Sequence, residues 1–151
     1  AEISFALQNI DTYEFEPDCS SVSLSYKRLL ALQITHLITK NFSNEVKPLT
    51  ANQISHTLEI PIRLVHQILY DLVGCGIAAE TKTEDDQVFA YQPACTVNLL
   101  TIKHVIDALD KSGTDDIPVA QNRELKVLLS TLEAFNDTIE KSSANKLLKD
   151  I

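Results

Sequence analysis

The chain has 151 residues, 44% hydrophobic and 23% charged, which is typical of a soluble globular protein that buries a core of its own. Its 13 Lys and Arg residues against 21 Asp and Glu residues give a net charge of -8, which disfavours a generic nucleic-acid or anionic-membrane binder. Only 3 glycines occur, so Gly-rich phosphate loops are excluded, and the spacing of Cys19, Cys75 and Cys95 matches no zinc motif.

The first 20 residues mix apolar and acidic side chains and read as a segment that follows something upstream. The carboxylates of Glu14, Glu16 and Asp18 stand close enough in sequence to bind a hard cation. No glycine turn or further oxygen ligand accompanies them, so a solvated acidic turn is the favoured interpretation. No run of 18 apolar residues is present, and we expect no membrane span in this chain.

A first helix is predicted to begin after Ser23 or Ser25 and to end near Phe42, because apolar residues recur along it with helical spacing. The next segment carries sharper signals. Thr50 and Gln53 form the capping-box pattern at the start of a short helix.

Pro61 then stands where the first turn of a second helix tolerates proline. This second helix is predicted to run to Gly74 and Gly76, which end it. Two short helices joined by a tight turn predict a helix-turn-helix.

Two short strands are predicted at 77–82 and 87–92, joined by an acidic tip, and a hairpin in this position forms a wing. Thr101 is expected to cap a further helix. After a polar break at 112–118, a long helix is predicted from about 119 to 141.

The predicted fold is therefore mainly α (α+β), a winged helix-turn-helix with an N-terminal helix, a short β-hairpin wing and a long C-terminal helix. We divide the chain into an N-terminal segment of juxtamembrane type (1–20), the winged helix-turn-helix domain (21–111), and the polar break, C-terminal helix and tail (112–151).

No catalytic constellation is found in the sequence. The four histidines fall on different predicted segments, and none pairs in an HxH, HxxxH or HExxH spacing that would hold a metal. His56 and His66 lie on the two helices of the helix-turn-helix, but chance explains their spacing. No GxSxG elbow orients a nucleophile. We expect no enzymatic activity, no metal and no cofactor.

In wording and order, the chain resembles the C-terminal region of the YihY/BrkB family, bacterial inner-membrane proteins also labelled "ribonuclease BN". Four stretches carry the resemblance: AEISFALQNIDTYEFEPD, YKRLLALQITHLI, PLTANQISHTLEIPIRLVHQILYDLVGCGI and YQPACTVNLLTIKHVIDAL. It covers most of residues 1–111 and weakens after Gly113. The stretch from Leu100 to Leu109 is also similar to the helix after the wing in winged-helix regulators of the iron-sulfur-regulator type, whose cysteine cluster this sequence lacks.

The family resemblance implies a cytoplasmic winged-helix tail behind several transmembrane helices, on the cytoplasmic side of the bacterial inner membrane. The favoured function is accordingly a non-catalytic module that acts through protein contacts, with the membrane part of its own chain as one partner and any other protein partner unidentified. A DNA-binding winged-helix regulator is the alternative. A share in a tRNA-processing ribonuclease, as the family label suggests, is a second alternative.

Charge on the predicted groove-facing elements disfavours nucleic acid as a partner. The second helix of the helix-turn-helix offers Arg63, His66 and Gln67 as candidate contacts, with Arg63 as its one cation near the start. The wing carries four carboxylates against Lys82 alone, a net charge of -3. Since phosphate contacts supply most non-specific affinity, we expect weak DNA binding at most.

The last predicted helix carries a candidate dimer seam, with large apolar residues spaced by three and four as in a heptad repeat. Either this seam packs back on its own domain, or it pairs two chains into a homodimer. The seam consists of Leu125, Leu128, Leu132, Phe135 and Ile139.

Overall fold

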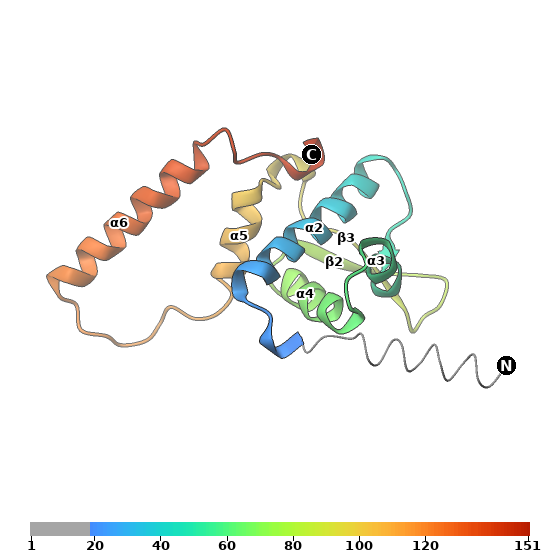
Figure 1. Ribbon diagram of the computed structural model, residues 1–151, viewed down its shortest axis with the longest axis horizontal. Helices are drawn as coiled ribbons and strands as arrows, with labels where there is room; N and C mark the ends of the chain where they lie inside the picture. Colours follow the sequence, from blue (N-terminus) through green and yellow to red (C-terminus); the bar gives the residue numbers. More distant parts are fainter. Residues whose placement is uncertain (1–18) are drawn as a thin grey trace.

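The computed structural model describes residues 19–151 (Figure 1), so the predicted acidic turn at 14–18 lies outside the described residues. A three-residue 3-10 helix, η1 (Cys19–Ser21), precedes the first long helix, α2 (Leu24–Ser43). The Ser23 hydroxyl accepts a hydrogen bond from the backbone N–H of Tyr26, which caps α2 and confirms the first of the two predicted starts.

The helix-turn-helix consists of α3 (Ala51–Leu58) and α4 (Ile62–Gly74). Both hydrogen bonds of the capping box between Thr50 and Gln53 are present at the start of α3. Pro61 lies just before α4 rather than inside it, so the helix begins one residue later than predicted.

Three antiparallel strands form the small sheet: β1 (Leu49–Thr50), β2 (Ala78–Lys82) and β3 (Phe89–Pro93), in the order β1-β3-β2. Strands β2 and β3 pair from Ala78 with Pro93 to Lys82 with Phe89, which makes the predicted wing hairpin. Strand β1 was not predicted. It precedes α3 directly and fastens the helix-turn-helix to the wing through β3.

A single core joins α2, the helix-turn-helix and the sheet, and its largest fully buried side chains include Ile34, Ile54, Leu69 and Leu100. Most apolar residues that helical spacing places on the inward faces of these helices are buried. Four of them are only half-buried: Leu58, Ile62, Ile106 and Leu109. The core nevertheless fixes α4 firmly, because that helix buries five side chains, namely Leu64, Val65, Ile68, Leu69 and Leu72.

The C-terminal part follows η2 (Val97–Leu99) and comprises α5 (Ile102–Asp110), α6 (Arg123–Glu140) and the 3-10 helix η3 (Leu148–Asp150). Thr101 caps α5 as predicted, accepting from the backbone N–H of His104. Helix α6 begins at Arg123 rather than near 119, since the Asn122 side chain accepts from the backbone N–H of Leu125 at 2.8 Å and sets the cap.

Helix α6 stands apart from the domain, yet its far end returns to it (Figure 1). The backbone N–H of Ile102 donates to the Lys146 carbonyl at 3.0 Å, and that of Leu148 donates to the Leu100 carbonyl at 2.9 Å. Leu148 itself is 2% exposed and belongs to the core. We call residues 111–147 the arm; it leaves the domain after α5 and is fastened again at η3. The described residues thus form a mainly α winged helix with five α-helices and one small sheet.

Candidate functional site

The outward side of α4 presents a continuous line of exposed side chains, which we call the α4 stripe. His66, Gln67 and Tyr70 lie three, four and seven residues after Arg63, so the four side chains share one helix face. Among the large hydrophobic and aromatic residues from 19 to 151, Tyr70 is the most exposed, at 81%. A guanidinium, an imidazole, an amide and a phenol therefore face outward together, and each can form hydrogen bonds to a partner.

The turn before α4 sets the direction of the stripe. Glu59 adopts a left-handed conformation with φ of 54°, which ends α3. The Ser55 hydroxyl donates to the Ile60 carbonyl at 2.6 Å and braces the same turn. Helix α3 adds exposed polar side chains next to this turn, namely Asn52, Gln53, His56 and Thr57.

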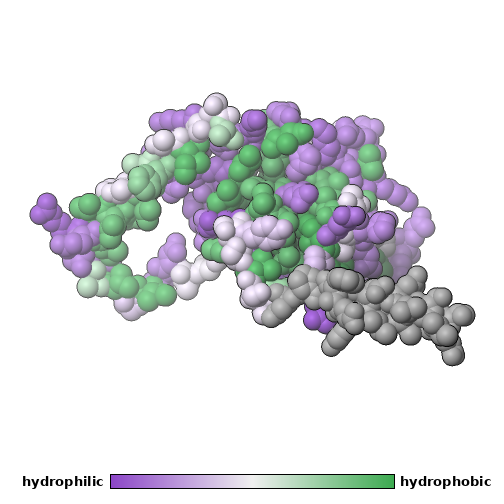
Figure 2. Space-filling model, in the orientation of Figure 1, coloured by the Kyte–Doolittle hydropathy of each residue, from purple (hydrophilic) through white to green (hydrophobic). Residues whose placement is uncertain are grey.

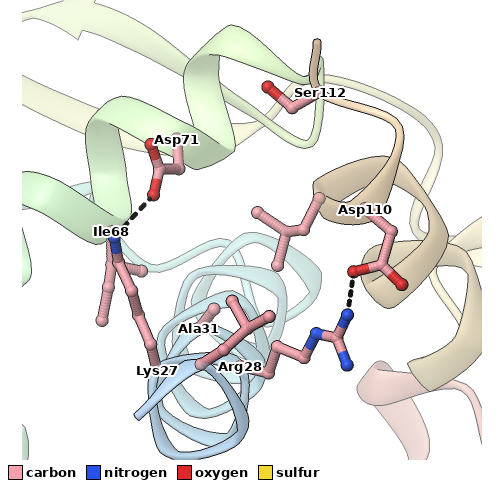
Figure 3. Close-up of a pocket in the computed structure, with 9 residues that line it drawn as sticks. Lys27, Arg28, Ala31, Ile68, Asp71, Asp110 and Ser112 are labelled. Atoms are coloured by element: carbon pink, nitrogen blue, oxygen red, sulfur yellow. Dashed lines mark hydrogen bonds and ion pairs between the residues drawn. The ribbon is translucent and has the colours of Figure 1, made fainter. Parts of the chain in front are cut away.

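Two ion pairs tie α2 to its neighbours, one to α4 and one to the end of α5 (Figure 3). Lys27 Nζ lies 3.1 Å from Asp71 of α4, and Arg28 is paired with Asp110 at the end of α5. They border a cavity of about 240 Å³ whose lining includes Ile68. Because the paired side chains are about a third exposed or more, each pair stabilises the fold by at most about 1 kcal/mol.

The wing is acidic and open to solvent. Its exposed charged side chains are Lys82 and four carboxylates, Glu80, Glu84, Asp85 and Asp86. The net charge of the wing is therefore -3. The Thr83 hydroxyl donates to the Val88 carbonyl at 2.8 Å and shapes the tip.

Lys47 approaches Glu84 at 3.9 Å, but both side chains are at least 90% exposed and the pair neutralises little of the wing charge. At the base of the wing, burial raises the pKa of Tyr91, and the neighbouring charge of Glu80 raises it further. The exposed carboxylates of the wing therefore present a negative field to the solvent.

The candidate seam lies on α6, and the structure leaves it uncovered. Its five residues are between 36% and 61% exposed, and Figure 2 shows an apolar surface along the arm, with open space between the arm and the domain. The expectation that this helix packs back on its own domain is not met in the described residues. Two further apolar residues on α6, Val127 and Leu129, were not included in the predicted seam and are exposed as well.

The predicted contact residues Arg63, His66 and Gln67 come together on α4. His56 and His104, which were not predicted as contacts, lie on α3 and α5. Tyr70 was missed, although its position seven residues after Arg63 marked the same face. Between residues 19 and 151, no three His, Cys, Asp or Glu side chains gather as a metal site would need. No helix in that range is long and apolar enough to cross a bilayer.

Comparison with solved structures finds winged-helix regulators. CymR, the global cysteine regulator of B. subtilis, is similar with a TM-score of 0.57 and 16% identity, over 85% of this chain and 95% of that one. IscR of T. potens is similar with a TM-score of 0.56 and 13% identity, over 88% of this chain and 90% of that one. CymR of Staphylococcus aureus is similar with a TM-score of 0.52 and 15% identity, over 82% of this chain and 93% of that one. At this identity the likeness establishes the winged-helix fold, and these neighbours are regulators rather than enzymes.

No protein-family model matches the chain, and no curated protein matches it in sequence.

Proposed function

We propose that this chain is a DNA-binding winged-helix regulator that contacts the major groove with the α4 stripe. The observation that carries the proposal is the exposed line of Arg63, His66, Gln67 and Tyr70 on the second helix of a helix-turn-helix. In such motifs this helix enters the major groove, where Arg pairs with guanine and Gln with adenine. The likeness to regulators over 82–88% of the chain supports this alternative better than it supports a membrane-protein tail.

The acidic wing sets the kind of binding to expect. With a net charge of -3, the wing repels phosphate, and Arg63 is the one Lys or Arg on α3 and α4. Few phosphates are then neutralised, and the affinity falls only gently with salt. We expect micromolar binding at low ionic strength, driven by base contacts more than by the backbone.

Fluorescence anisotropy with mixed-sequence duplex DNA at low salt tests the proposal, because electrostatic attraction is strongest there. Arg63→Ala should weaken binding about 5- to 150-fold, as expected for the loss of one bidentate base contact. The matched control is Lys111→Ala, which removes the same charge from an exposed position after α5 and should change affinity little.

A second pair of variants tests the wing. Asp85→Asn with Asp86→Asn should strengthen DNA binding, because both carboxylates are exposed at the tip. If neither the original chain nor this wing variant binds duplex DNA, or if Arg63→Ala behaves like Lys111→Ala, the DNA proposal is wrong.

A second candidate function is a non-catalytic module that binds protein on the cytoplasmic side of the bacterial inner membrane. The acidic wing favours it, because exposed carboxylates suit a partner that carries positive charge. The resemblance of residues 1–111 to the YihY/BrkB family supports it independently. Sequencing the gene upstream of Ala1 tests this candidate: several long apolar helices there would support it, and a start codon at that point would reject it.

A further inference from the structure

The cavity of about 240 Å³ lies where α2, α4 and the end of α5 come together (Figure 3). Its apolar lining includes Ala31 of α2, Ile68 of α4 and Leu109 of α5, and the first two are at most 2% exposed. Its polar lining consists of the two ion pairs of α2 and of Ser112. An aliphatic wall with a few polar groups that converge on it is the usual composition of a small-molecule site.

The two ion pairs leave hydrogen-bonding capacity on the side chains that form them. Arg28 meets Asp110 through Nη2, whereas its Nε is buried and has no hydrogen-bond partner among the described residues. Lys27 Nζ lies 3.1 Å from one oxygen of Asp71, and an ammonium can donate three hydrogen bonds. Because a buried N–H without a partner is costly, a ligand that brings an acceptor atom to Arg28 would be stabilised there.

We propose that this cavity binds a free α-amino acid with an aliphatic side chain, such as leucine. The charged side chains of the lining are two cations and two carboxylates, so their formal charges sum to zero. A ligand with only a carboxylate would be repelled by the two Asp residues, and a ligand with only an amine would be repelled by Lys27 and Arg28. A zwitterion places each of its charges beside an opposite one and adds no net charge to the cavity.

The unpartnered Nε of Arg28 indicates where the charged end of the amino acid binds. The ligand carboxylate accepts a hydrogen bond from this N–H, and the ligand ammonium donates to the carboxylate of Asp110. Ser112, two residues further along the chain, supplies a hydroxyl that can donate or accept. The aliphatic side chain of the ligand then packs against Ile68 and Leu109.

The size and accessibility of the cavity suit a ligand of this class. An apolar cavity of about 150 Å³ holds benzene, so about 240 Å³ holds roughly ten non-hydrogen atoms, which is close to the size of leucine. The ion-paired side chains are 32–43% exposed, so the ligand can reach them from the solvent. Exposed ion pairs of this kind contribute little to stability, and they can therefore rearrange around a ligand at small cost.

Isothermal titration calorimetry of the whole chain with L-leucine tests the proposal, and we expect saturable binding with a dissociation constant below about 1 mM. Two analogues keep the side chain of leucine but only one of its charges: 4-methylpentanoate lacks the ammonium, and 3-methylbutylamine lacks the carboxylate. Each should bind at least about tenfold more weakly, because one charged contact is lost. L-Glutamate and L-lysine should also bind more weakly than L-leucine, since their side chains would place a charge against Ile68 and Leu109.

Two variants test the residues assigned to the charged end. Arg28→Gln and Asp110→Asn each remove one charge and nearly preserve side-chain length, and each should weaken the binding of L-leucine at least about tenfold. Lys126→Gln and Asp86→Asn are the matched controls, because both residues are exposed and lie outside the cavity lining. They should leave the affinity unchanged. Circular dichroism checks that all four variants fold.

Three results would overturn the proposal. The first is the absence of saturable binding at about 10 mM L-leucine. The second is binding of a singly charged analogue, or of L-glutamate or L-lysine, that is as tight as the binding of L-leucine. The third is unchanged affinity in a folded Arg28→Gln variant. Because no DNA enters these measurements, this inference and the proposed function can fail separately.

Discussion

Truncating Leu148 to alanine probes how firmly the end of the arm is fastened. The side chain is 2% exposed in the core, and Leu→Ala changes at such positions cost about 2–5 kcal/mol. The lower end applies here, because Leu148 lies in a three-residue 3-10 helix, which can shift to fill part of the cavity. We expect the free energy of unfolding to fall by about 2–3 kcal/mol.

Urea unfolding measures this loss, and hydrogen exchange locates it. The backbone N–H groups of Ile102 and Leu148 donate to Lys146 and Leu100 across the junction, so both should lose protection, while amides within α4 keep theirs. Ile151→Ala is the matched control, since that side chain is 53% exposed. If Leu148→Ala unfolds like Ile151→Ala and the junction amides stay protected, the fastened arm is not a real feature of the chain.

Three further changes test other parts of the fold. Replacing Thr50 with alanine removes the side-chain half of the capping box and should lower stability by about 1 kcal/mol in urea unfolding, whereas an unchanged midpoint would contradict the cap. Leu69→Ala should cost about 2–5 kcal/mol and the adjacent Tyr70→Ala about 0.5 or less, since one side chain is buried and the other 81% exposed; equal losses would refute the assigned faces of α4. Burial raises the pKa of the Cys75 and Cys95 thiols above the ordinary 9.0. The thiols of the unfolded chain therefore ionise at lower pH than those of the folded chain, and the free energy of unfolding should decline as pH rises through this value. The decline should shrink when both cysteines are replaced by alanine.

Much of the helix-turn-helix could be predicted because its signals are local. The capping box at Thr50 depends on residues three apart. The apolar residues of α4 recur with helical spacing, so periodicity alone predicts that Ile68 and Leu69 are buried. Strand β1 carried no such signal. Its two residues, Leu49 and Thr50, form a strand only through pairing with β3 about 40 residues later in the chain, which is a tertiary effect.

The candidate site was predictable in the same uneven way. Arg63 and Gln67 could be predicted, because they are polar residues near the start of a helix. Tyr70 is an aromatic residue in an apolar stretch, so the sequence suggests a core position, and only the packing of α4 shows that it is exposed. The predicted start of α6, near 119, is too early, because the helix is capped by the side chain of Asn122. Whether the seam packed inward could not be known from spacing, because a heptad pattern fits both arrangements.

The acidic wing has a consequence for discrimination. Its carboxylates repel every stretch of nucleic acid equally, whatever the sequence. They subtract the same amount from binding at a cognate site and from binding anywhere else along a genome, where competing sites outnumber the right one by about a millionfold or more. What remains is the part of the binding energy that depends on bases. Under the proposed function, a chain with such a wing spends little time on bulk DNA. It also stays only briefly at a cognate site, unless a second DNA-binding surface contacts the DNA beside it.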